Sequence, residues 1–345
     1  MNRLTVLIGS CLTVITLLSL NTVSAAVPTD ESALLFDDFP LEDPLEHPSW
    51  FKQSFLDLPD DMAEALEKGK KGIIVYFGQK RCAYCRMLME VNFKLPDIVN
   101  YTRKNFDLVP IDIRGIEDVT DLQGKELNVR DYVLREKADF TPSLIFYDKD
   151  GNKALMLRGY YPPYKFRAAL EYVADGHYKK ETFAAYLERG ETTLRFEMGE
   201  LNQEEFFISP PHNLDRSRFP GERPLVVFFE QTECHACDVL HAQPLREPAI
   251  NKLFQSFDNV QIDIWSDVPI VTPDGRRMTA KQWARSLGLF YAPSLIFFDE
   301  RGKEILRVES VVHFFRLRNV LNYVTSRGYL TEPNFMRWRM GGGFR

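Results

Sequence analysis

The feature that most constrains the fold of this chain is an internal repeat. Four runs of the first half return in the second half, in the same order and at an offset of 151 or 152 residues. Self-similarity at a fixed period indicates repeated structural units, so we predict two related domains in tandem. The matching runs are VYFGQKRCAYC (75–85) with VFFEQTECHAC (227–237), LVPIDI (108–113) with NVQIDI (259–264), FTPSLIFYDKDGN (140–152) with YAPSLIFFDERGK (291–303), and AALEYV (168–173) with NVLNYV (319–324).

Each copy has the same predicted order of elements. A β-rich run ends at two cysteines, and a helical stretch that contains proline follows; then come a strand, a shorter helix, a hairpin and a last helix. This alternation indicates an α/β fold in which each copy is a mixed sheet flanked by helices. The predicted elements lie at 73–77, 85–106, 108–113, 125–137, 143–157 and 164–174 in the first copy, and at 225–229, 237–257, 260–264, 279–288, 294–308 and 314–325 in the second.

Ahead of the first copy, residues 1–26 have the pattern of a secretory signal peptide. Arg3 precedes an apolar stretch from Leu4 to Leu20, and small residues follow up to Ala26. An uncleaved membrane anchor is the alternative, although the apolar stretch is short for a membrane span. Cleavage would remove Cys11 and leave two cysteines in each copy. Export implies an oxidising compartment, for which we predict the periplasm.

The remaining chain divides into three predicted parts. Residues 27–48 are acidic and interrupted by prolines, and we expect an acidic linker that is a solvated tether. Residues 49–190 and 191–345 are the two predicted domains. The formal net charge is −6 at pH 7, and no basic stripe is present, so the sequence does not indicate a nucleic-acid partner. It leaves the oligomeric state open.

The cysteine pairs Cys82–Cys85 and Cys234–Cys237 have three interpretations. Four thiolates in two such pairs are typical of a zinc site, but 148 residues separate Cys85 from Cys234, and each pair occupies the same place in its own copy. A structural disulfide is the second interpretation, although so short a loop removes little entropy from the unfolded chain. The third interpretation is a redox centre in each copy.

The redox interpretation explains why each pair follows a strand. A cysteine in the first turn of a helix lies at unsatisfied N–H groups and at the positive end of the helix dipole, which favours its thiolate. The second cysteine, three positions later, lies on the same face of the helix. The first cysteine can therefore attack a substrate disulfide, and the second can resolve the mixed disulfide that forms.

The strand, the C-x-x-C pair at a helix start and the proline before each SLIF strand resemble the thioredoxin fold. The runs CAYCRMLMEVNF and FTPSLIFYDKDGNKALMLRGYY, with the final helix, resemble the periplasmic thioredoxin-related group. That group includes the sulfur-oxidation-associated thioredoxins and shares features with bacterial disulfide isomerases. The resemblance covers about 70–190 and 220–330.

This resemblance implies a set of site residues and partners. Cys82 and Cys234 would be nucleophiles, and Cys85 and Cys237 resolving thiols. Pro142 and Pro293 would be cis prolines beside the pairs, in loops that align an extended substrate. The substrate-binding residues would be Tyr84, Thr141, Pro142, His235, Ala292 and Pro293.

The implied activity is thiol–disulfide exchange without a cofactor or metal, in the reducing or isomerising direction. Its partners would be protein disulfides or thiols, with a membrane electron-transfer protein as donor. The alternative is a binding module, either a metal carrier or a folding chaperone, in which one or both cysteine pairs are inert.

Two departures from thioredoxin bear on the chemistry. The buried Asp of thioredoxin, six positions before the first cysteine, is replaced by Tyr76 and Phe228, so the usual proton acceptor is missing. The two pairs also differ in nearby charge, which leads to the hypothesis that Cys82 is the more acidic nucleophile. The charged neighbours are Lys80, Arg81 and Arg86 in the first copy and Glu230, Glu233 and Asp238 in the second.

Overall fold

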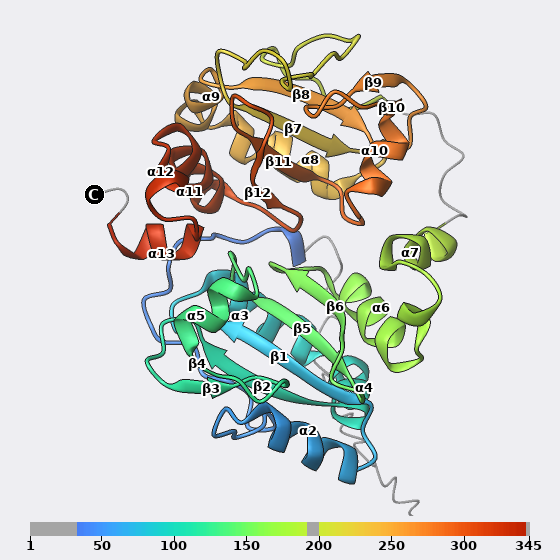
Figure 1. Ribbon diagram of the computed structural model, residues 1–345, viewed down its shortest axis with the longest axis vertical. Helices are drawn as coiled ribbons and strands as arrows, with labels where there is room; N and C mark the ends of the chain where they lie inside the picture. The colour runs from blue at the N-terminus through green and yellow to red at the C-terminus, as the bar shows by residue number, and fades with distance from the viewer. Residues whose placement is uncertain (1–32, 192–199, 343–345) are drawn as a thin grey trace, which may run out of the picture.

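The computed structural model describes residues 33–191 and 200–342, and it contains two four-stranded mixed sheets (Figure 1). The predicted signal peptide lies outside the described residues. In both sheets a central strand pairs in parallel with one neighbour and antiparallel with the other. The first sheet has the order β2 (Phe106–Asp112), β1 (Gly72–Gly78), β5 (Ser143–Asp148), β6 (Lys153–Arg158), and the second β8 (Asp258–Asp263), β7 (Leu225–Glu230), β11 (Ser294–Phe298), β12 (Glu304–Val308).

Helices cover both faces of each sheet, and this explains why the central strands are apolar along their whole length. Every residue of β1 is buried; Ile73, Val75 and Phe77 belong to one core cluster, and Ile74 and Tyr76 to another. The helices of the first domain are α2 (Leu58–Glu67), α3 (Ala83–Glu90), α4 (Pro96–Asn105), α5 (Val129–Arg135), α6 (Pro163–Ala174) and α7 (Phe183–Glu191). Those of the second are α8 (His235–Ala242), α9 (Pro248–Phe254), α10 (Ala280–Ser286), α11 (Phe314–Thr325), α12 (Gly328–Thr331) and α13 (Phe335–Met340).

The predicted fold class is confirmed, with local differences. Each long helical stretch is split as its prolines predict, since α4 and α9 both begin at a proline. The helix expected from Lys125 begins only at Val129, because residues 126–128 form strand β4 (Glu126–Asn128), which pairs with β3 (Asp118–Thr120). A matching hairpin in the second domain joins β9 (Pro269–Val271) to β10 (Arg277–Thr279). No helix of the described residues is long and apolar enough to cross a membrane.

The two domains contact each other through equivalent surfaces. The loop after β6 meets the loop after β12: the N–H of Val311 donates to the carbonyl of Tyr160 (3.3 Å), and these two residues are equivalents in the repeat. Contacts between equivalent residues lie at an approximate two-fold axis, as in an isologous dimer. The same symmetry relates Lys165 to Arg316.

The segment before α2 does not behave as the solvated tether that its acidic composition suggests. It follows the seam between the two domains (Figure 1), and its apolar residues Ala33 and Leu34 are buried. Phe36 packs edge-on against Tyr84 of the first domain and against His313 of the second. A short apolar run within an acidic stretch therefore anchors this segment to both domains. The predicted domain boundaries themselves stay predictions.

We expect Gly159→Ala to loosen the domain interface. Gly159 has a φ of +101°, and an added Cβ would lie 2.6 Å from Cβ of Ser310, so rotation of the serine hydroxyl cannot relieve the clash. Such overpacking costs about 1–3 kcal/mol. Gly176→Ala is the matched control, because Gly176 has a φ of +76° and nothing within 4 Å of the added carbon. Small-angle scattering should give a larger radius of gyration for Gly159→Ala only; equal radii and equal melting temperatures for the two variants would contradict this interface.

Candidate redox site

Each cysteine pair lies where a central strand passes into a helix. Cys82 and Cys234 are the residues immediately before α3 and α8, and the N–H of the second cysteine donates to the first sulfur at 3.0 and 3.1 Å. The Cα atoms of each pair are 5.1 Å apart, and each pair closes a disulfide on itself. After reduction, the same N–H group and the helix dipole favour the thiolate of the first cysteine.

The first pair is covered. The two residues between its cysteines, Ala83 and Tyr84, are both buried, as is Cys82. The cover consists of the segment before α2 and of helices α11 and α13, and a cavity of about 30 Å³ remains beside Cys82. That volume holds about one water molecule, so an extended protein substrate has no room there in this arrangement.

The cover is held by a cluster of polar contacts, which we call the clasp and define as Asp38, Tyr84, Thr141 and Arg316. Arg316 of the second domain donates to the carbonyl of Thr141 (2.8 Å), and its guanidinium lies 3.4 Å from the centre of the Tyr84 ring. Thr141 precedes Pro142, and this peptide bond is cis. Arg316 thus binds a main-chain carbonyl in the loop that the thioredoxin resemblance assigns to substrate binding.

Asp38 completes the clasp from the N-terminal segment. Its carboxylate accepts hydrogen bonds from the hydroxyl of Tyr84 (2.7 Å) and from the backbone N–H groups of Phe315 and Arg316 (2.8 Å each) in the first turn of α11. Burial raises the pKa of Tyr84 well above its ordinary value, so the hydroxyl stays protonated and donates. Tyr84, predicted to bind substrate, is in this conformation a contact between the domains.

The second pair is less covered, although Cys234 itself is also buried. His235, between its cysteines, is exposed, and Ala236 is half-buried. The sulfur of Cys234 lies 3.5 Å from the carbonyl of Ala292, which precedes the cis Pro293. Lys165, the equivalent of Arg316, reaches the carbonyl of Phe290 (3.1 Å) instead of that of Ala292. Equivalent cations in the two copies therefore bind carbonyls at different positions relative to the cis proline.

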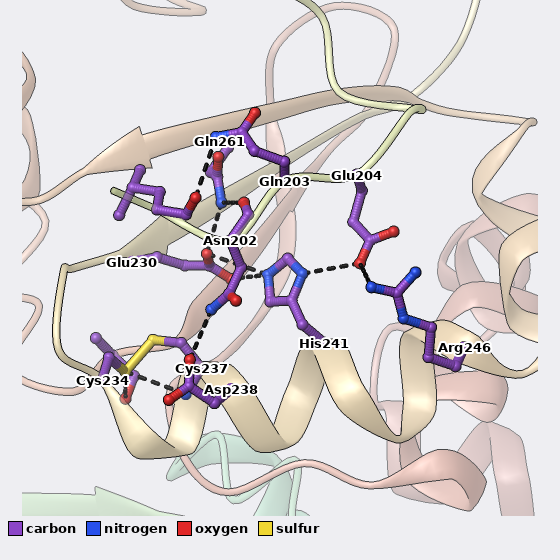
Figure 2. A network of polar contacts seen from close by, with 12 residues as sticks. Asn202, Gln203, Glu204, Glu230, Cys234, Cys237, Asp238, His241, Arg246 and Gln261 are labelled. Carbon is purple, nitrogen blue, oxygen red and sulfur yellow. Dashed lines mark hydrogen bonds and ion pairs between the residues drawn. A yellow bond between two sulfur atoms is a disulfide. The ribbon is translucent and has the colours of Figure 1, made fainter. Parts of the chain in front are cut away.

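Beneath the second pair is a buried ionic network (Figure 2). His241 on α8 contacts Glu230 at the end of β7 through Nε2 (3.0 Å) and Glu204 through Nδ1 (3.0 Å). Gln261 on β8 donates to Glu230 (2.7 Å). Burial by itself would lower the pKa of His241, but the hydrogen bonds and charges of both glutamates outweigh it, and the pKa is raised. Glu230, expected as one of the charges around Cys234, is in fact fully buried and ion-paired.

The first domain has no counterpart of this network at the same positions. Gly78, Met89 and Pro110 stand where the second domain has Glu230, His241 and Gln261. The hydroxyl of Tyr76 occupies the space into which a side chain at position 78 would extend, and burial raises the pKa of this tyrosine. The buried surroundings of the first pair are thus largely apolar, whereas those of the second pair are ionic.

The thioredoxin-like domain family matches residues 58–174 and 211–325, which together are more than half of the chain. The chain belongs to the thioredoxin-like domain family. The predicted tandem of two such domains is confirmed. No curated protein sequence matches the chain.

Several solved structures are similar to parts of this thioredoxin-like protein. A thioredoxin-fold protein from Helicobacter pylori is 20% identical, with 42% of this chain and 93% of that chain covered and a TM-score of 0.34. A thioredoxin from Thermus thermophilus is 19% identical, with coverage of 41% and 95% and a TM-score of 0.28. The C-terminal domain of DsbD from Neisseria meningitidis, in its reduced form, is 16% identical, with coverage of 31% and 84% and a TM-score of 0.24.

Adjacent cysteine pairs at this place in thioredoxin-like domains support thiol–disulfide oxidoreductase activity, which confirms the predicted reaction class. Pro142 and Pro293 are cis, as the resemblance implied. The roles of the four cysteines and of the six substrate-binding residues stay predictions. Within residues 33–191 and 200–342, no group of three or more His, Cys, Asp or Glu side chains is placed to hold a metal ion.

Sequence reasoning missed three residues that matter at the thioredoxin-like sites, namely His241, Asp38 and Arg316, and it identified Glu230 only as a nearby charge. Glu230 and His241 each lie four positions from a cysteine of their pair, where the first copy has Gly78 and Met89, so a comparison of the two copies could have found them. Asp38 and Arg316 had no such signal. They meet only because the domains pack together, and Asp38 was one acid among many.

We expect Arg316→Met to expose the first pair. Hydrogen bonds to charged groups contribute about 1.5–3 kcal/mol, so loss of the bond to Thr141 should increase the alkylation rate of reduced Cys82 roughly tenfold or more. The rate is measured with a bulky maleimide in the full chain that also carries Cys234→Ser and Cys237→Ser. Arg318→Met, on the same helix but stacked on Phe314 and Phe315, is the control, and equal rates in both variants would show that Arg316 does not hold the cover.

The network of His241 should also make stability depend on pH. Because its pKa in the folded protein is raised above 6.5, its stabilisation is fully present below about pH 6.5 and is lost as the pH rises through the folded-state value. The difference in melting temperature between the parent and His241→Gln should therefore be largest near about pH 5.5 and shrink toward about pH 9. A difference that does not change with pH would show that His241 is neutral in this network.

Proposed function

We propose that this protein is exported and reduces or isomerises protein disulfides, with Cys234 as the sulfur that first meets the substrate. The observation that carries the proposal is the open second centre. Exposed His235 flanks Cys234, and the Ala292 carbonyl beside this sulfur is not taken by Lys165. This loop can therefore pair with the main chain of an extended substrate.

The reaction that we propose begins with attack of the Cys234 thiolate on a substrate disulfide. Cys237 then attacks the mixed disulfide, so that the Cys234–Cys237 bond forms and the substrate leaves as a thiolate. Two electrons pass from the cysteine pair to the substrate. In an isomerase cycle the freed substrate thiol instead attacks another disulfide of the same protein. The thiolate released there attacks the mixed disulfide, so that Cys234 leaves as a thiolate and the pair stays reduced.

The export proposal rests on the signal-peptide pattern of residues 1–26 and assigns the protein to the periplasm. An oxidising compartment would require a source of electrons for a reductase, which we assign to a membrane electron-transfer protein. The covered first pair supports a division of labour, in which the second domain meets the substrate and the first pair reacts only when the domains separate.

The test is the turnover of a protein disulfide together with the reduction potential of each pair. We expect the full chain to reduce insulin catalytically with a thiol donor, and both potentials to lie near that of thioredoxin, about −270 mV. The potentials are separated with full-chain variants that carry serine at Cys82 and Cys85 or at Cys234 and Cys237.

Two results would contradict the proposed direction or class. Potentials near about −120 mV would make the protein an oxidant that inserts disulfides. Stoichiometric reaction without turnover, accompanied by tight retention of copper or zinc, would favour the binding module instead.

A further inference from the structure

Cys237, the proposed resolving thiol of the second centre, has to lose its proton while it is buried. Cys237 is completely buried, and a thiol must become a thiolate before it can attack. Solvent cannot take the proton directly. Phe228 stands at the position of the buried acid of thioredoxin, so the acceptor has to come from another position.

The buried network lies on the same side of α8 as this thiol. His241 follows Cys237 by four residues on α8, so the two side chains lie on the same face with Cβ atoms about 5–6 Å apart. Figure 2 shows Glu230, His241 and Cys237 on one side of the helix that carries Cys237 and His241. Both carboxylate oxygens of Glu230 lie at Nε2 of His241, at 3.0 and 3.2 Å.

The network has the charge and the connection to solvent that a proton path needs. Carboxylates face both ring nitrogens of His241, and its raised pKa favours the charged imidazole, so the network has one more carboxylate than it has cations. The side chains of Glu230, His241 and Glu204 are 1%, 4% and 6% exposed, whereas Arg246, 3.8 Å from Glu204, is 67% exposed. The other polar groups that face this network are Gln261 on β8, Asn202 in the segment before β7, and Asp238 on α8, which accepts a hydrogen bond from Asn202.

We propose that Glu230 accepts the proton of Cys237 during resolution, and that His241 in turn releases a proton to solvent through Glu204. The inference rests on the proposed function, because it describes one step of that reaction. The Cys237 S–H bond breaks and Glu230 is protonated; the thiolate attacks Cys234, and the bond from Cys234 to the substrate breaks. His241 then gives its Nδ1 proton to Glu204, which releases it to solvent beside Arg246, while Nε2 keeps its own proton.

The first domain provides the contrast. Cys85 is equally buried, but Gly78 and Met89 replace the glutamate and the histidine. We therefore infer that the relay belongs to the second centre, and that the two centres resolve mixed disulfides with different dependence on pH.

The experiment reads the two chemical steps separately. The full chain with Cys82→Ser and Cys85→Ser is reduced and mixed, in excess, with 5,5′-dithiobis(2-nitrobenzoate). Attack by Cys234 releases one thionitrobenzoate, and resolution by Cys237 releases the second. Because general-base catalysis contributes 10²-fold or more, Glu230→Gln should slow the second release about 100-fold near pH 7 and leave the first unchanged. The difference should shrink as the pH approaches the ordinary thiol pKa of about 8.5.

A matched pair of variants separates the relay from a structural role. Glu204→Gln should slow the second release several-fold, whereas Glu205→Gln, at the exposed neighbouring residue, should not. If Glu230→Gln does not fold, this pair decides the question.

An unchanged second release, with an unchanged pH profile, in the folded relay variants would overturn the relay and leave the oxidoreductase intact. Failure of the parent itself to release any thionitrobenzoate would instead overturn the proposed function.

Discussion

The arrangement of the molecule depends on the bond from the Arg316 guanidinium to the Thr141 carbonyl. A guanidinium stays charged even when it is buried, so it must be given partners there. The Tyr84 ring faces the guanidinium, and the Thr141 carbonyl takes one of its N–H groups. The Asp38 carboxylate, which accepts the backbone N–H of Arg316, adds a favourable charge nearby. In this way the loop beside the first cysteine pair, the N-terminal segment and the second domain are held together by one cation. The covered cysteine pair is a direct consequence of this packing.

The repeat gives the two domains equivalent surfaces, and sequence differences between the copies make the contacts of these surfaces unequal. Because the copies share a fold, the surfaces beside their cis prolines are equivalent and meet around an approximate two-fold axis. Lys165 stands where the other copy has Arg316, yet it reaches a carbonyl two residues away from the one that lies beside Cys234. Beneath the sulfurs the divergence is larger, since Met89 in one copy corresponds to His241 in the other. A single fold thus provides one apolar and one ionic setting for the same chemistry.

Much of the fold could be predicted from the repeat alone, because strands, split helices and prolines recur at a constant offset. The cis geometry of Pro142 and Pro293 followed from the resemblance to thioredoxin. The clasp could not be predicted, since it joins residues that are about 280 positions apart through domain packing, which no local pattern encodes. The role of Asp38 could not be predicted for a second reason, because the acidic composition of its segment suggests solvation. Its neighbours Leu34 and Phe36 are apolar, and their packing brings Asp38 to the seam between the domains.

We propose that access, rather than thiolate charge, decides which centre reacts first. The cations around Cys82 in the sequence are expected to favour its thiolate, but the clasp covers it. The most direct test mixes the fully reduced full chain with a protein disulfide, quenches it at early times by alkylation, and identifies each pair by mass spectrometry. We predict that the disulfide between Cys234 and Cys237 appears first. Earlier or simultaneous oxidation of Cys82 and Cys85 would contradict the account.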